Sequence, residues 1–161
     1  MYENIFNIVE QYSKGVHLLN KGATESELND FEDKYQMNLP TELRELLKIS
    51  NGFELYALPV GTCVSGIVGN GARNNGVFYL EDNFDMEKRA GVPGDIFMIA
   101  IECNCDIIGI DPQKSTLDKL HIIELNPETG KVVDEWDSVN DWLMAVIDAG
   151  QDIFDFNGNE I

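Results

Sequence analysis

The chain of 161 residues contains 29 acidic and 11 basic residues, which give a formal net charge of −18 at neutral pH. This charge argues against binding to nucleic acid or to an anionic membrane, because both partners need Lys and Arg to contact phosphate. The length and a hydrophobic content of 43% predict one globular domain over residues 1–161, which can bury a core without disulfides.

The sequence shows no clear sign of membrane insertion, export or disulfide bonding. No apolar run approaches the ~20 residues that span a bilayer, and the first residues lack the basic start and apolar run of a signal peptide. We therefore expect a cytoplasmic protein. Cys63, Cys103 and Cys105 are too few for a disulfide framework, and no second Cys or His cluster lies at zinc-site spacing. Buried or turn-flanking thiols are the favoured interpretation.

The first part of the chain predicts two helices. Apolar residues recur at helical spacing within residues 1–13, so an amphipathic helix is expected there, followed by a short extended segment at residues 16–19. A second helix begins after Thr24, which can form a capping box with Glu27 three residues later. This helix is expected to end near Tyr35.

Residues 39–53 contain start, periodicity and stop signals for a third helix. Pro40 suits the first helical position, where its missing N–H leaves no hydrogen bond unmade. Three leucines fall on one face: Leu43, Leu46 and Leu47. Asn51 and Gly52 follow where a left-handed residue is expected to end the helix, and Phe53 is placed to fold back onto the last turn.

This order of elements resembles the N-terminal signature of the SMI1/KNR4 (SUKH) family: a capped acidic helix, Leu-Pro, a leucine-faced helix and Asn-Gly, here over residues 24–53. Gly130, Val132 and Trp136 resemble the late hairpin of that family, and residues 139–149 resemble its closing helix. The resemblance covers most of the chain. It rests on order and spacing, because none of these motifs is chemically unique.

The middle of the chain predicts short strands and loops. Residues 56–76 are rich in glycine and asparagine, but no Gly-Lys-Ser/Thr of a phosphate-binding loop follows the glycines. We therefore expect no nucleotide or other cofactor. Residues 77–80 predict a strand, and residues 81–87 predict an acidic loop.

The later strands are predicted with their connections. Residues 96–101 and 106–111 are apolar runs that predict a β-hairpin, with the first run central in the sheet. Two more strands are expected at residues 120–125 and 132–136, joined by a turn. Short links of this kind predict a mostly antiparallel β-sheet, and the order helix, strands, helix predicts an α+β fold that packs the sheet with the N-terminal helices and a C-terminal helix.

The closing helix is expected over residues 139–149, with Ser138 as its N-cap and Gly150 just past its end. One core should join its apolar stripe to that of the third helix. The residues concerned are Leu43, Leu46, Leu47, Trp142 and Leu143. For Phe154 and Phe156 in the tail, both docking and fraying stay open.

Motifs for catalysis are missing from the sequence. The two histidines, His17 and His121, lie outside any recognisable Ser, Cys or metal motif, and nothing singles out one carboxylate pair for glycoside hydrolysis. We expect no catalytic, cofactor-binding or metal-binding residues. The resemblance implies a protein-binding module instead, because many bacterial SMI1/KNR4 members are immunity proteins that neutralise a cognate polymorphic toxin, often a nuclease. Other relatives are regulatory scaffolds.

The negative charge suits a basic protein partner, such as a toxin domain, whose association it would accelerate electrostatically. Solubility is an equally simple reason for the charge. We predict that the partner-binding patch includes some of the acids in or beside the expected inter-strand connections. These are Glu81, Asp82, Asp85, Glu102, Asp106, Asp134, Glu135 and Asp137. A regulatory scaffold and an enzyme or small-ligand protein are the alternatives, and the sequence carries no signal for oligomeric state.

Overall fold

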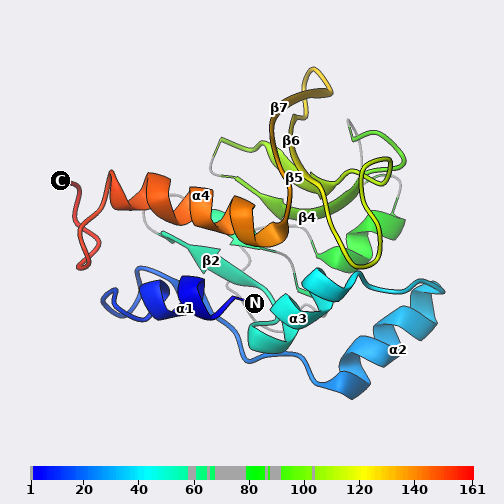
Figure 1. Cartoon of the computed structure of the whole chain (residues 1–161), viewed down its shortest axis with the longest axis horizontal. Helices are drawn as coiled ribbons and strands as arrows, with labels where there is room; N and C mark the ends of the chain where they lie inside the picture. Colours follow the sequence, from blue (N-terminus) through cyan, green and yellow to red (C-terminus); the bar gives the residue numbers. More distant parts are fainter. Residues whose placement is uncertain are drawn as a thin grey trace.

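The computed structural model describes residues 2–57, 61–64, 66–67, 79–85, 87, 92–102 and 104–161. In these parts of the chain, N-terminal helices precede most of a β-sheet and a last helix follows it (Figure 1). The elements are α1 (Glu3–Val9), β1 (Leu18–Leu19), α2 (Glu25–Tyr35), α3 (Thr41–Ile49), β2 (Phe53–Leu55), β3 (Thr62–Val64), the 3-10 helix η1 (Leu80–Phe84), β4 (Phe97–Ile101), β5 (Ile107–Ile110), β6 (Ile122–Asn126), β7 (Lys131–Trp136) and α4 (Val139–Gln151).

The strands form a seven-stranded sheet in which every neighbouring pair is antiparallel and the spatial order follows the chain from β1 to β7. The predicted α+β fold with an antiparallel sheet is therefore confirmed. The predicted hairpin is β4 and β5, with Ile101 opposite Ile107, and β4 is central as expected. Because β1 and β2 are only two and three residues long, they lack the alternation by which a sequence indicates a strand.

The helical hairpin α2–α3 begins with the capping box that was predicted. The Glu27 backbone N–H donates to Thr24 Oγ1 at 3.3 Å, and the Thr24 N–H donates to Glu27 Oε2 at 2.7 Å. Pro40 is the N-cap of α3 and not its first helical residue, so that prediction is wrong by one position. The fixed φ of proline suits either position, whereas its extended ψ of 145° places it outside the helix.

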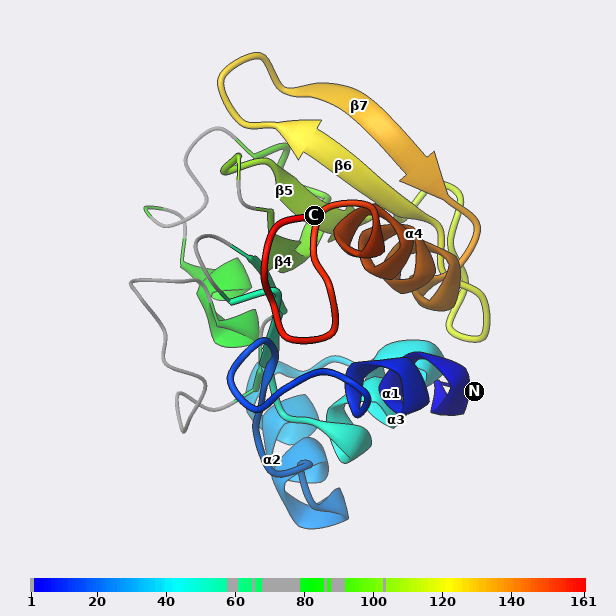
Figure 2. The same cartoon turned by 90° about the vertical axis from the view of Figure 1, so that its left-hand side faces the viewer.

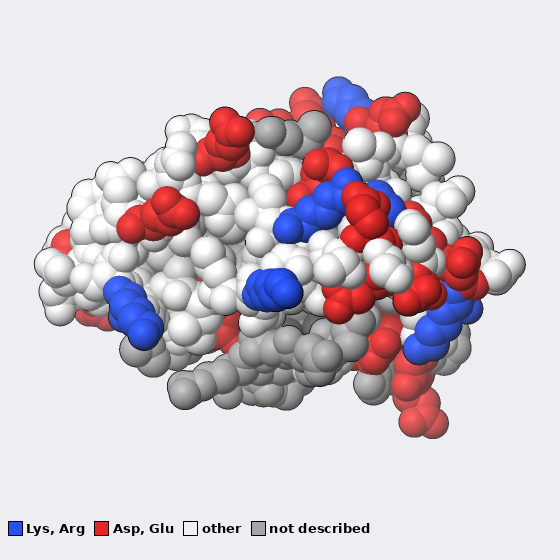
Figure 3. Space-filling view, turned by 90° about the horizontal axis from the view of Figure 1, so that it is seen from below, with Lys and Arg blue, Asp and Glu red and all other residues white. Residues whose placement is uncertain are grey.

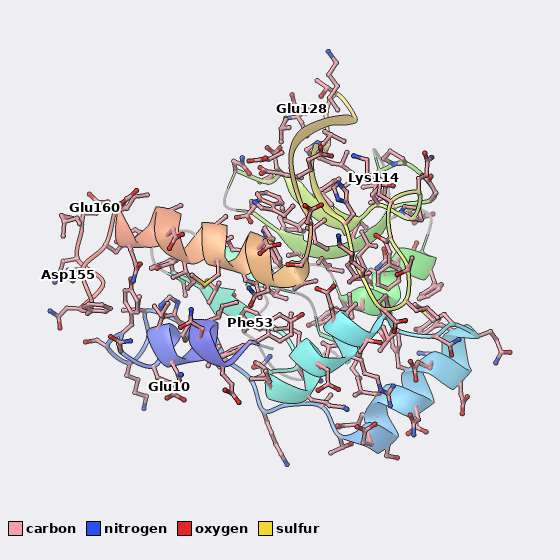
Figure 4. All side chains as sticks on the ribbon, viewed as in Figure 1. Glu10, Phe53, Lys114, Glu128, Asp155 and Glu160 are labelled. Carbon is pink, nitrogen blue, oxygen red and sulfur yellow. The ribbon has the colours of Figure 1, made fainter. Side chains whose placement is uncertain are left out.

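The chain leaves α3 and enters the sheet within a few residues. Gly52 has the left-handed φ of +81° that was expected, and Phe53 after it begins β2. Its ring is fully buried and packs edge-on to Phe6 of α1, with ring centroids 5.7 Å apart (Figure 4). Phe53 therefore joins the sheet to the N-terminal helix.

The main core confirms the prediction that the apolar stripes of α3 and α4 belong to one core. Its five predicted members, Leu43, Leu46, Leu47, Trp142 and Leu143, are each at most 1% exposed. A smaller cluster lies on the other face of the sheet and contains Ile96, Met98, Ile107, Ile123 and Leu125. Helix α4 lies against one face of the sheet, with α1 and α3 beyond it (Figure 2).

Two further predictions need correction. A strand was predicted at residues 77–80, but Leu80 begins η1, and residues 77–78 lie outside the described residues. The turn of η1 lets the Asn83 side chain form hydrogen bonds with the Met98 backbone. Gly150 lies inside α4, which continues to Gln151. A Cβ at Gly150 would lie 2.0 Å from Cε2 of Tyr56, so this glycine marks a close approach between α4 and Tyr56 rather than the end of the helix.

The C-terminal tail docks onto the N-terminal part of the chain. Phe154 stacks on Tyr56 with ring centroids 5.6 Å apart, and Phe156 meets Tyr12 edge-on at 4.9 Å. Cys63 is half-buried and Cys105 is exposed in the turn between β4 and β5, while Cys103 lies outside the described residues. Among the described helices, none combines the length and the apolar character that crossing a membrane requires.

Candidate partner-binding cleft

A cleft of about 350 Å³ lies between α4 and the strands, and we take it as the candidate functional site. Helix α4 contributes Ala145, Ala149 and Gly150 to its lining. Ala145 and Ala149 are four positions apart and therefore share one face of the helix, and the small size of all three residues leaves the space open. Trp136 of β7 and Trp142 of α4 border the cleft, but Trp142 is fully buried, so of the two only Trp136 offers accessible aromatic surface.

Glu102, directly after β4, places a carboxylate in this cleft. Its Oε1 accepts a hydrogen bond at 3.3 Å from Nε1 of the fully buried Trp142, and its Oε2 accepts one from the Thr62 hydroxyl. Burial raises the pKa of the Glu102 carboxyl, the two hydrogen bonds oppose this rise, and the charge of Asp106 adds to it. The carboxylate is therefore fixed in place in an environment that does not favour its charge.

Two more acids line the same cleft from the neighbouring strands. Glu124 of β6 lies directly opposite Asp134 of β7, and like charges at opposed positions repel each other. Burial is the main cause that raises the pKa of Glu124, and the charge of Glu102 is the next. Among the described residues that line the cleft, none is basic. Within the described lining, the site thus concentrates negative charge with no basic side chain beside it.

Asp106 is a further acid close to Glu102 and Glu124. It is 8% exposed, and its carboxylate accepts hydrogen bonds from the side-chain amides of Asn104 at 2.9 Å and Asn126 at 3.2 Å. Three of the eight predicted partner-binding acids, Glu102, Asp106 and Asp134, are therefore brought together around one cleft. The prediction missed Glu124, although a single acid inside the apolar run Ile122–Leu125 is a signal that could have found it.

The other five predicted acids lie elsewhere. Glu135 contacts Lys114 at 2.6 Å and His121 at 3.0 Å, and Asp137 lies 3.5 Å from His121. Glu81, Asp82 and Asp85 belong to η1 and its C-cap. Of these five, only Asp82 is buried, and it accepts a hydrogen bond from the Tyr79 backbone at 2.8 Å. The eight acids thus form three groups, and partner contact by each stays a prediction.

Acidic side chains on the α2–α3 hairpin differ from those of the cleft because they have basic partners. Arg44 contacts Glu25 and Glu32 at 2.6 Å each, and Lys48 contacts Glu25 at 2.5 Å and Glu45 at 2.8 Å. Lys and Arg lie among the acids over the half of this face that contains α2 and α3 (Figure 3). Part of the negative charge of the hairpin is therefore neutralised within the chain, by Arg44 and Lys48.

The histidines take part in contacts within the chain. His17 Nδ1 accepts a hydrogen bond from the Tyr56 backbone N–H at 3.1 Å, and its ring packs edge-on against those of Tyr12 and Tyr56. His121 contacts Glu135 and Asp137. Within the described part of the chain, no group of three or more His, Cys, Asp or Glu is arranged to hold a metal ion.

Comparisons with known proteins agree with this fold. The model of the SMI1 / KNR4 family (SUKH-1) matches residues 22–145, which is well over half of the chain. A crystal structure of a protein from Pseudomonas syringae pv. tomato is similar with a TM-score of 0.61 and 16% identity, over 91% of this chain and 97% of that one. This second similarity concerns the fold alone, and no curated protein matches the chain. The chain belongs to the SMI1/KNR4 (SUKH-1) family.

Proposed function

We propose that this protein is a non-enzymatic immunity-type module that neutralises a basic toxin domain, such as a nuclease, by binding it through an acidic surface centred on the cleft. The observation that carries this proposal is the group formed by Glu102, Glu124 and Asp134, which share one cleft without a basic residue among its described lining. Membership of the SMI1/KNR4 family supports a protein partner.

Inhibition by such a surface follows from electrostatics. A nuclease must present basic residues to phosphate, and an acidic protein that covers those residues competes with the substrate for the same site. The net charge of −18 also raises the rate of encounter with a basic partner. No chemical step by the immunity protein is required.

The cleft also has the composition of an energetically important interface centre. Trp136 supplies aromatic surface, and the acids at the cleft supply charge complementarity to a basic partner. Aromatic residues in desolvated pockets dominate many protein interfaces, whereas exposed charges act mainly on association rates. The exposed acids Asp85, Glu135 and Asp137 are proposed to steer the partner, and the cleft to hold it.

The test is to isolate the partner from the native host with a tagged protein and then to assay the partner with and without it. We expect a basic protein whose activity falls on binding, and an association rate that drops steeply between low and physiological salt. The double variant Glu124→Gln with Asp134→Asn should weaken binding. The matched variant Glu128→Gln, at the exposed tip of the β6–β7 hairpin, should not (Figure 4).

Two results would contradict the proposal. An association rate that is unchanged by salt would remove the electrostatic mechanism. A partner that keeps its full activity in the complex would point to a regulatory scaffold.

A further inference from the structure

We propose that the cleft receives an arginine side chain of the protein partner, with its guanidinium group bound between the carboxylates of Glu102, Glu124 and Asp134. This inference rests on the proposed function and specifies the chemical group that is recognised. It starts from the shape and lining of the cleft, and not from the overall charge of the protein.

The lining requires a ligand that is both apolar and cationic. Ala145, Ala149 and Gly150 leave an open apolar wall, and three carboxylates from other elements face the same space. A volume of about 350 Å³ lies at the lower end of the roughly 300–1,000 Å³ of ligand sites, which suits one long side chain better than a helix or strand of the partner. The methylene stem of a long cationic residue can pack on the apolar wall while its charged end reaches the carboxylates.

A metal ion is a poorer occupant. Within the described residues, the carboxylates are not arranged as a group of three ligands for one ion. They come from the turn after β4, from β6 and from β7, so an extended cation can contact them more readily than a point charge. Carboxylates that come from three different elements suit a planar group with several donors.

Arginine satisfies these conditions better than lysine. Its guanidinium has five N–H donors in a fixed plane, forms paired hydrogen bonds with carboxylates, is weakly hydrated and stacks on aromatic rings. Glu102 is already oriented by Trp142 and Thr62, so it need not be ordered when the ligand arrives. Trp136 in the lining offers an aromatic face for a cation.

The two tryptophans make the cleft directly observable. The chain contains only Trp136 and Trp142, and both line the cleft, so every indole N–H signal in an NMR spectrum reports on this site. We would titrate the protein with an acetylated and amidated Gly-Arg-Gly peptide, and with the same peptide containing citrulline, the uncharged analogue of arginine, or lysine.

The arginine peptide should shift both indole signals in a saturable manner. The citrulline peptide should bind at least about tenfold more weakly, because a charge-assisted hydrogen bond contributes more than the free energy of a tenfold change. Binding of the lysine peptide should lie between them. Glu102→Gln and Glu124→Gln should each weaken arginine binding about tenfold, and Glu128→Gln should leave it unchanged.

Two results would overturn this inference: equal binding of the arginine and citrulline peptides, or no saturable shift of either indole signal. A basic partner that binds Glu102→Gln and Glu124→Gln with unchanged affinity would also overturn it, while neutralisation of that partner through the exposed acids outside the cleft would stand. Specific binding of the arginine peptide together with failure to isolate a basic partner would support the inference and count against the proposed function.

Discussion

Replacement of Glu42 tests whether the buried carboxylate of α3 holds the fold together. Glu42 is 5% exposed, and its Oε1 accepts a hydrogen bond from the Leu120 backbone N–H at 3.0 Å. Its Oε2 accepts one from the N–H of Val139, also at 3.0 Å, and Val139 is the first residue of α4. One side chain therefore joins α3 to α4 and to the segment that leads into β6.

The expected loss of stability follows from these two contacts. A buried N–H left without an acceptor costs about 1–3 kcal/mol, so Glu42→Ala, which removes both acceptors, should cost roughly 3–5 kcal/mol. Loss of a negative charge at the N-terminus of α4 contributes to this value. Glu42→Gln keeps one acceptor and turns an amide N–H₂ toward the other donor, so about half of that loss is expected. Both are large fractions of the roughly 5–15 kcal/mol that stabilises a typical domain.

Urea denaturation followed by tryptophan fluorescence measures the free energy of unfolding of each variant. Glu45→Gln is the matched control, because Glu45 lies on the same helix, is half-exposed and forms an ion pair with Lys48 at 2.8 Å. This control should change stability by less than about 1 kcal/mol. An unfolding free energy for Glu42→Gln that equals that of Glu45→Gln would refute the reasoning, since the two bonds would then contribute nothing.

Three further predictions concern stability. Burial lowers the pKa of His17 to about 4, so between pH 6.5 and 4 the unfolded chain binds a proton that the folded chain does not. The free energy of unfolding should therefore fall as the pH drops from 6.5 toward 4. Urea titrations of His17→Gln should show a smaller dependence on pH. Burial raises the pKa of Glu102, so ionisation of this carboxyl opposes folding at pH values above its ordinary pKa of 4.5. Glu102→Gln should therefore raise the melting temperature at pH 7, although it weakens cation binding. Leu46→Ala should lower the unfolding free energy by about 2–5 kcal/mol, because Leu46 is fully buried between α3 and the main core; an unchanged denaturation midpoint would show that this helix face is exposed.

Elements with a clear hydrophobic periodicity could be predicted from the sequence, and elements that depend on tertiary contacts could not. The leucine stripe of α3 and the stripe of α4 that includes Trp142 gave both helices and their shared core, because each stripe has to be buried. The hairpin of β4 and β5 followed from two apolar runs and a short link. By contrast, β2 is too short for any alternation to be visible, while β1 lies within the short extended segment expected at residues 16–19.

Burial of single polar residues was also hard to predict, because it too depends on tertiary contacts. An acid in the first turn of a helix, such as Glu42, is usually solvated, and its burial here depends on partners 78 and 97 positions away. The cleft is a similar case. Its acids were partly predicted as members of inter-strand connections, but the space between them depends on Ala145, Ala149 and Gly150, whose small size has no obvious meaning until α4 is placed on the sheet.

The position of α4 in the chain also determines when a binding-competent molecule first exists during synthesis. All seven strands leave the ribosome before α4, so a nascent chain can form the sheet while the helical wall of the cleft is still missing. At about 5–20 residues per second, the fifteen residues between Trp136 and the end of α4 make this interval roughly one to three seconds. Under the proposed function, newly started chains give a cell no protection during this time. Protection must come from molecules already completed, which favours synthesis of the immunity protein ahead of its toxin and in excess over it.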